Sequence, residues 1–173
     1  MIYYVLDTSS LLRALRDGRI YELLEKGFVA ITSLVLHEIK SSTSKIALDS
    51  IKDRLSIIDP TSKSIRYIQN IASKSGDIPA LSDTDISVIA LALELNEKEY
   101  KTVVVSEDYA IQNVCKILGL HVIGLYFGEI KEVFKRAKKC LVCGTIYDPS
   151  MNSCPSCGSG NYKLVRIKQK RKS

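Results

Sequence analysis

The chain has 173 residues, 46% of them hydrophobic, and its 25 lysines and arginines outnumber 19 acidic residues, giving a formal net charge of +6. This length provides for one α/β core and a small second module. No apolar run reaches the roughly 18 residues that a membrane helix needs, and the first residues predict a strand instead of a targeting segment, so we expect a cytoplasmic protein without a membrane partner.

Taken in chain order, the hydrophobic pattern alternates between strands and helices. Short apolar runs predict strands at 3–6, 28–31, 55–58, 102–105 and 121–123. Helical spacing and capping residues predict helices at 9–15, 20–26, 34–40, 45–54, 64–73, 83–95 and 109–118. For 125–139 we expect a linker with some helix. The alternation indicates the α/β class, with a parallel sheet that helices cover on both faces.

Positive charge is concentrated in the C-terminal part of the chain. Residues 1–128 contain 14 lysines and arginines against 16 acidic residues, whereas residues 129–173 contain 11 against 3. Such a surplus favours a polyanionic partner, although a solvated helix face and a frayed tail would have the same composition. The candidate RNA-binding residues are Lys135, Arg136, Lys138, Lys139, Lys163, Arg166, Lys168, Lys170, Arg171 and Lys172.

Four cysteines form two Cys-x-x-Cys pairs, Cys140 with Cys143 and Cys154 with Cys157, and glycine follows each pair directly. Each short turn aims two thiolates at one point, and two such turns form a closed tetrahedral zinc site. Because a closed site has no open position, we expect this zinc to be structural. The alternative is disulfides or redox-active pairs, which neither a secretion signal nor a thioredoxin-like pattern supports. The fifth cysteine, Cys115, is predicted to be core.

These observations divide the chain into four parts. We expect an α/β domain at 1–125, a basic linker at 126–138, a zinc ribbon at 139–165 and a basic tail at 166–173. The chain has no Walker loop and no Ser–His–Asp set, so we expect no nucleotide cofactor.

Acidic residues occur where predicted strands end or helices begin. Asp7 follows the first strand, Asp108 follows the strand at 102–105, Glu38 lies on the helix after the second strand, and Asp85 opens the long helix. Because sites in open parallel sheets form outside the carboxyl ends of strands, we expect these side chains to converge. Crowded carboxylates repel one another, and Mg²⁺ or Mn²⁺ relieves that repulsion, activates a water and stabilises charge on a phosphodiester.

Each of these acids also has a purely structural explanation. Asp85 stands three residues after Ser82, so it would complete a capping box, and Asp83 would complement the helix dipole. Asp7 would serve as an N-cap, and Glu38 as a solvated helix residue. Their shared location at strand ends and helix starts favours a common site over unrelated roles.

The ordered acidic motifs resemble those of PIN-domain nucleases over residues 1 to about 125. They comprise Leu6-Asp7-Thr-Ser, Glu38 on the helix after the second strand, Leu81-Ser-x-Thr-Asp85, and Ser106-Glu-Asp108-Tyr-Ala. With a zinc ribbon directly behind the PIN-like part, the whole chain resembles the compact archaeal form of the "Nin one binding" endonucleases, a family that matures the 3′ end of small-subunit ribosomal RNA.

The resemblance implies a metal-dependent endoribonuclease that cleaves single-stranded precursor small-subunit rRNA on the nascent small ribosomal subunit. It implies that Mg²⁺ or Mn²⁺ binds a catalytic cluster of Asp7, Glu38, Asp85 and Asp108, with Asp83 and Glu107 as auxiliary acids. The family usually has Thr-Asp-Asp-Tyr where this chain has Ser-Glu-Asp-Tyr at 106–109, which leaves the role of Glu107 open. Gln112 and Asn113 are expected to touch RNA or to brace Asp108.

Two other functions are compatible with the same residues. A toxin-type PIN ribonuclease would share the acids, but such toxins generally lack the ribbon. A non-catalytic RNA-binding adaptor would use the fold as a scaffold, but a scaffold has no need to hold four carboxylates together. Cleavage of single-stranded RNA with Mn²⁺ separates the enzymes from the adaptor.

Overall fold

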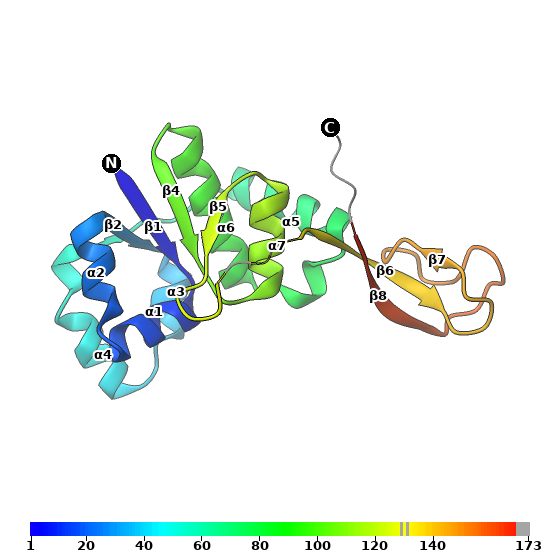
Figure 1. The fold of residues 1–173 in the computed structure, drawn as a ribbon, viewed down its shortest axis with the longest axis horizontal. Helices are drawn as coiled ribbons and strands as arrows, with labels where there is room; N and C mark the ends of the chain where they lie inside the picture. The colour runs from blue at the N-terminus through cyan, green and yellow to red at the C-terminus, as the bar shows by residue number, and fades with distance from the viewer. Residues whose placement is uncertain (129, 131, 169–173) are drawn as a thin grey trace.

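The computed structural model describes residues 1–128, 130 and 132–168, and it contains two separate sheets (Figure 1). The larger sheet has the strand order β3-β2-β1-β4-β5, and all of its neighbouring strands are parallel. Its strands are β1 (Ile2–Leu6), β2 (Phe28–Ile31), β3 (Leu55–Ile57), β4 (Lys101–Val105) and β5 (His121–Ile123). The predicted parallel α/β sheet is therefore confirmed.

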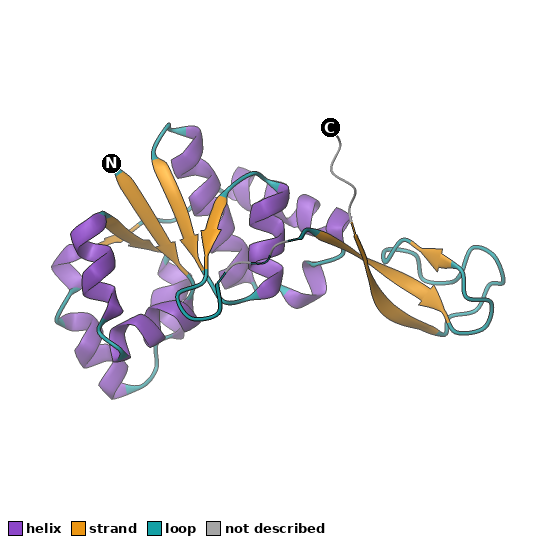
Figure 2. Cartoon of the chain, in the orientation of Figure 1, coloured by secondary structure: helices purple, strands orange, loops and turns teal. Residues whose placement is uncertain are grey.

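Helices lie on both sides of this sheet (Figure 2). They are α1 (Thr8–Arg16), α2 (Arg19–Lys26), α3 (Ser33–Glu38), α4 (Ser42–Asp49), α5 (Ser62–Ser75), α6 (Asp83–Glu97) and α7 (Tyr109–Ile117), with 3₁₀ turns η1 (Lys52–Arg54) and η2 (Ile78–Ala80). The predicted helix at 45–54 is instead the end of α4 followed by η1. Among the described residues, no helix has the length and apolar character to cross a membrane.

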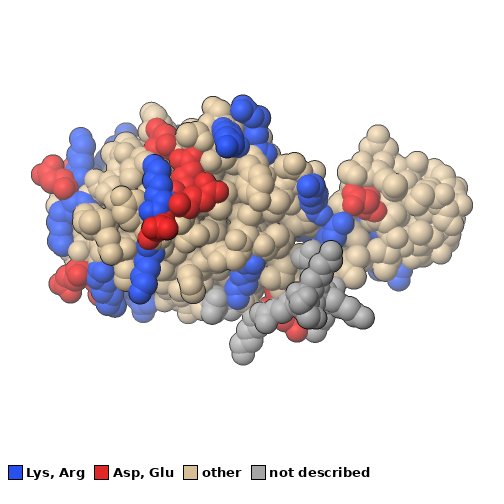
Figure 3. Space-filling view, turned by 90° about the horizontal axis from the view of Figure 1, so that it is seen from above, with Lys and Arg blue, Asp and Glu red and all other residues tan. Residues whose placement is uncertain are grey.

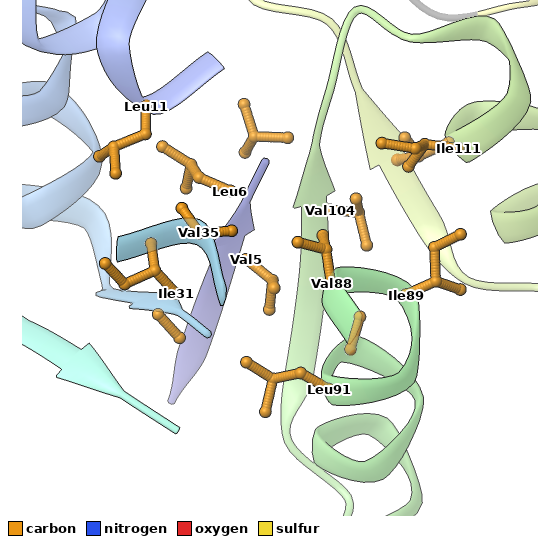
Figure 4. Close-up of a cluster of buried hydrophobic side chains, with 14 of the residues drawn as sticks. Val5, Leu6, Leu11, Ile31, Val35, Val88, Ile89, Leu91, Val104 and Ile111 are labelled. Atoms are coloured by element: carbon orange, nitrogen blue, oxygen red, sulfur yellow. The ribbon is translucent and has the colours of Figure 1, made fainter. Parts of the chain in front are cut away.

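Helix α6 is the centre of the hydrophobic core. It packs on β1 and β4, and its Val88, Ile89 and Leu91 are at most 1% exposed. Figure 4 shows these side chains together with Val5 of β1 and Val104 of β4. Burying one such side chain stabilises a fold by about 1.5–3 kcal/mol, so this contact holds the start of α6 firmly at one edge of the sheet.

The second sheet is antiparallel and has the order β7-β6-β8, formed by β6 (Phe134–Cys140), β7 (Ile146–Tyr147) and β8 (Tyr162–Lys168). We call it, with its cysteine turns, the ribbon module; it extends from the α/β domain as a lobe of its own (Figure 1). The helix expected within 125–139 is wrong, because the described residues of this segment contain none and 134–140 is a strand. Strand β8 also includes 166–168, which we expected to be tail.

Candidate active site and metal centre

The carboxyl ends of β1 and β4 form the candidate active site. β1 lies between β2 and β4, so the strand order reverses direction at β1. Such a switch point opens a crevice outside the carboxyl ends of the two strands. Asp7 follows β1 directly, and Ser106 to Asp108 follow β4. The opposite end of the molecule, where β1 begins, has lysines and arginines interspersed with acids (Figure 3).

Asp7 is held on both of its oxygens. Its side chain is only 3% exposed, and Oδ1 accepts hydrogen bonds from the amide of Ser10 at 2.6 Å and from the hydroxyl of Ser9 at 3.1 Å. The hydroxyl of Ser106, a fully buried residue, donates to Oδ2 of Asp7 and accepts from the amide of Asp108 at 3.0 Å. One serine therefore ties the two acidic positions together. Sequence analysis missed this role, although the position of Ser106 directly after β4 was a usable signal.

Asp108 and Asp85 each begin a helix and keep one oxygen unused. Asp108 caps α7, with Oδ1 accepting from the amides of Ala110 at 2.6 Å and Ile111 at 3.1 Å. Asp85 completes a capping box with Ser82, whose amide donates to Oδ2 at 2.8 Å. No described residue donates to the second oxygen of either acid. The capping box expected for Asp85 is therefore confirmed, and Asp108 is a helix cap as well; each acid still has one oxygen without a donor among the described residues.

The pKa of Asp85 is evidence that like charges surround it. Burial raises this pKa above its ordinary value, and the charges of Asp108 and Asp7 raise it further, while hydrogen bonds from Ser82 oppose the rise. Repulsion between carboxylates of this kind favours a bound cation or a retained proton. The charges of Asp7 and Asp108 therefore reach Asp85, and a shared site for the three acids stays a prediction.

The remaining acids differ in what they contact. Glu38, the last residue of α3, accepts a hydrogen bond from the hydroxyl of Thr8, the residue after Asp7, and so joins the site. Asp83 is exposed on the first turn of α6. Glu107 accepts from the backbone amides of Tyr126 at 2.8 Å and of residue 127 at 3.3 Å. Glu107 therefore anchors the loop after β5.

These acids suit a hard divalent cation by their chemistry. Carboxylate oxygens with unused lone pairs are the ligands that Mg²⁺ and Mn²⁺ prefer. In the described part of the chain, no three carboxylates gather into a group comparable to that of the cysteine sulfurs. By its chemistry, the set of carboxylate oxygens therefore fits a hard divalent cation.

The cysteine turns form a compact set of four sulfur ligands, which could bind a metal such as zinc. All four ligand atoms, from Cys140, Cys143, Cys154 and Cys157, lie within 4.8 Å of one another. Two cross-turn sulfur pairs are 3.5 Å apart, close to the roughly 3.8 Å expected for tetrahedral zinc with 2.3 Å bonds. The cysteines are free thiols, so the disulfide alternative is wrong.

The two turns have the same backbone design. In each, the glycine after the second cysteine has a positive φ, +75° at Gly144 and +73° at Gly158, which favours glycine. Its amide donates to the carbonyl of the first cysteine of the pair, at 3.1 Å and 2.8 Å respectively. The two glycines therefore allow the backbone of each turn to close. Hydrogen bonding with Thr145 lowers the pKa of Cys143 to about 6, which favours the metal-binding thiolate.

Several predicted RNA-binding cations make contacts inside the protein. Arg136 pairs with fully buried Asp77 at 3.0 Å. Lys138 is 9% exposed and donates to the carbonyl of Met151 at 2.8 Å. Lys135 pairs with Asp148 at 3.3 Å. Nε of Arg136 and Nζ of Lys138 are therefore engaged within the protein.

Other cations remain on the surface of the ribbon module. Lys139 and Lys163 are exposed and lie directly opposite each other on β6 and β8. The guanidinium of Arg166 lies over the ring of Tyr109 at 4.3 Å, although the residue remains exposed. Lys168 ends β8, and Lys170, Arg171 and Lys172 lie outside the described residues.

Gln112 and Asn113 serve neither of the roles that we expected. Both are buried, and neither contacts the Asp108 carboxylate. The side chain of Asn113 donates to Asp77 at 2.7 Å and exchanges two hydrogen bonds with the backbone of Phe134. Gln112 donates to the carbonyl of Ser106 at 2.7 Å. α7 therefore connects the end of β4 to the start of the ribbon module.

Comparison with known proteins agrees with this geometry. A family model described as the PIN domain of ribonuclease matches residues 4–95. Endoribonuclease Nob1 of Pyrococcus abyssi is 38% identical over 143 residues, which cover 80% of this chain and 84% of that protein. Endoribonuclease Nob1 of Methanocaldococcus jannaschii is 35% identical over 175 residues, covering 97% and 82%.

Two further similarities carry other names. Ribonuclease VapC1 of Thermoplasma acidophilum is 31% identical over 173 residues, covering 98% of this chain and 80% of that protein. Among solved structures, VapBC2 from Rickettsia felis bound to a promoter DNA fragment superposes with a TM-score of 0.52 at 23% identity, over 72% of this chain and 98% of that chain. The second likeness concerns the fold alone.

The acidic edge of the sheet and the family match together define a PIN-domain ribonuclease. The relatives named Nob1 align with most of the chain, at higher identity than the relative named VapC1. The chain therefore belongs to the Nob1 family of PIN-domain endoribonucleases.

Proposed function

We propose that this protein is a Mg²⁺- or Mn²⁺-dependent endoribonuclease that cuts single-stranded precursor small-subunit rRNA at its 3′ end during ribosome maturation. The observation that carries the proposal is that Ser106 ties Asp7, at the end of β1, to Asp108, after β4, at the switch point of the sheet. The rRNA substrate rests on the family resemblance, as does action on the nascent small subunit.

Asp7, Glu38, Asp85 and Asp108 would hold the catalytic ion. When bound, such an ion supplies an activated water and neutralises charge that develops on the scissile phosphodiester. Ser106 and the helix amides keep Asp7 and Asp108 fixed before substrate arrives, so little reorganisation is needed on binding. A crevice at the edge of an open sheet admits a flexible single strand more readily than a rigid A-form duplex.

The ribbon module would provide a second RNA-binding surface. A zinc ion in its four-sulfur site has no open position, so we assign it a structural role. Lys139 and Lys163 face each other across β6 and β8, and like charges directly opposite destabilise a strand pair. A phosphate backbone relieves that repulsion and gains affinity in return.

The test uses a transcript that spans the 3′ end of small-subunit rRNA and its downstream spacer, incubated with Mn²⁺ and mapped by primer extension. Wild-type protein should make one cut at the mature end, and Asp7→Asn and Asp85→Asn should make none. Asp53→Asn is the control, because Asp53 is an exposed acid on η1, which precedes β3 and therefore lies at the opposite edge of the sheet from the acidic site. It should cut at close to the wild-type rate.

Thermal stability of the same samples shows whether Asp85 serves the active site or stabilises the fold. In buffer without divalent ions, Asp85→Asn should be at least as stable as wild type, because the amide oxygen can still accept from Ser82 and one repelling charge is gone. Scattered cleavage of any single strand would favour the toxin-type ribonuclease. Tight binding without cleavage would favour the adaptor.

A further inference from the structure

One large aromatic side chain near the acidic site is almost fully exposed. Phe127, in the loop after β5, is 83% exposed. A ring that is exposed to this extent offers its face to a ligand, and a ligand that covered it would bury apolar surface. The loop lies beside α1 at the carboxyl ends of the strands, as the yellow segment after β5 in Figure 1 shows.

The backbone of this loop is firmly anchored. Glu107, adjacent to Asp108, accepts from the amides of Tyr126 and Phe127. The loop closes so tightly that a Cβ on Gly124 would lie 2.4 Å from the carbonyl oxygen of Gly128 and 2.7 Å from Oε2 of Glu107. The backbone therefore presents Phe127 at a defined place, although nothing in the described structure covers the ring.

Two arginines flank the aromatic residues of the loop. The guanidinium of Arg13 lies 5.0 Å from the ring centroid of Tyr126 and 5.8 Å from that of Phe127. The guanidinium of Arg19 lies 4.7 Å from the ring of Tyr126. No carboxylate of the described residues forms an ion pair with either arginine. The loop is thus an aromatic surface beside two cations, which is the composition of single-strand nucleic-acid sites.

Helix α1 connects this surface to the acidic site. Ser9 donates to Asp7, and Arg13 is one helical turn further along α1 on the same face, about 6 Å away. Ser9, Arg13 and Arg16 of α1 and Thr43 and Ser44 of α4 line a groove of about 420 Å³, which no residue of the loop after β5 lines. A strand leaving the acidic site along this groove passes Arg13 next.

We propose that Phe127 stacks on an unpaired base next to the scissile phosphate, while Arg13 and Arg19 contact the phosphates on either side of that base. The ligand is single-stranded RNA; an aromatic face accepts any base, so the contact positions the strand without selecting sequence. The proposal rests on the proposed nuclease function for its substrate but concerns residues outside the acidic cluster.

The experiment measures binding of single-stranded RNA oligonucleotides, each with one abasic nucleotide at a different position, in buffer without Mg²⁺ or Mn²⁺. With wild-type protein, removal of one particular base should weaken binding about fivefold or more. Phe127→Ala should bind the intact RNA about fivefold more weakly and lose the sensitivity at that position. Phe127→Leu retains an apolar side chain without a π face, and it should behave like Phe127→Ala.

Tyr67→Ala is the control, because Tyr67 is a half-exposed aromatic on α5 whose loss should leave the abasic profile unchanged. If Phe127→Ala binds RNA with wild-type affinity and keeps the sensitivity to the same abasic position, Phe127 does not stack on a base. Another partner, such as a protein, would then cover the ring. Cleavage by the wild type under Mn²⁺ is scored separately. If the wild type cuts RNA but Phe127→Ala leaves RNA binding unchanged, the stacking proposal fails and the nuclease function stands. If Phe127→Ala removes the sensitivity to the abasic position but the wild type does not cut, the nuclease function fails and the stacking proposal stands.

Discussion

Replacing Arg136 with methionine tests how the ribbon module is attached to the nuclease domain. Asp77 is fully buried, and it accepts from Arg136 at 3.0 Å, from the hydroxyl of Ser75 at 2.7 Å and from Asn113 at 2.7 Å. Removing one partner of a buried pair costs about 3–5 kcal/mol, because the other charge stays buried without compensation. The two remaining hydrogen bonds reduce that cost, so we expect a loss of about 3 kcal/mol.

The assay is urea unfolding followed by circular dichroism, since the chain has no tryptophan. Lys135→Met is the matched control: Lys135 is the adjacent residue, and its pair with Asp148 is partly exposed, so its loss should cost at most about 1 kcal/mol. Adding Asp77→Asn to Arg136→Met should recover part of the stability, because no buried charge then remains. Equal losses of unfolding free energy in Arg136→Met and Lys135→Met would refute the stabilising role of the buried pair.

Three further predictions concern the ribbon module and its junction. Cys154→Ser should lower the zinc content from one ion per chain and disorder β6–β8, while the NMR signals of the large sheet persist. A zinc-release assay and NMR spectra would measure both effects, and unfolding of the whole protein would contradict this prediction. Gly76→Ala should destabilise the protein more than Gly119→Ala. Both glycines have a positive φ, but only a Cβ at Gly76 would meet the Cβ of Arg136, at 2.8 Å. Equal unfolding midpoints would exclude this close approach. Deleting 169–173 removes three cations, so the slope of log affinity for single-stranded RNA against log salt should become shallower by about 2; an unchanged slope would make the tail a solubilising appendage.

Local features of the chain were predictable because neighbouring residues decide them. The capping box of Ser82 and Asp85 depends on residues three apart, and the cysteine turns depend on residues within five positions of one another. The alternation of strands and helices likewise follows from short-range hydrophobic periodicity. The position of acids after strands indicated which edge of the sheet would carry them.

The segment before the first cysteine was not predictable in the same way. Residues 134–140 alternate between the two faces of a strand, but lysine and arginine occupy both faces and conceal the period of two. The strand exists because β8, far along the chain, pairs with it. The surplus of charge suggested RNA contacts for Arg136 and Lys138, whereas Arg136 pairs with a buried carboxylate and Lys138 donates to a backbone carbonyl.

The sequence by itself determined the class of fold, the four sulfur ligands, and the acids that belong at the carboxyl ends of the strands. Only the tertiary structure decided which of these groups meet. Placing β1 beside β4 brings Asp7 and Asp108 to one buried serine, and folding of the loop after β5 engages Glu107 and leaves Phe127 exposed. Ser106 and Asp7 are 99 positions apart, and Glu107 and Tyr126 are 19 apart, so these two contacts depend on the packing of whole elements and not on local propensity.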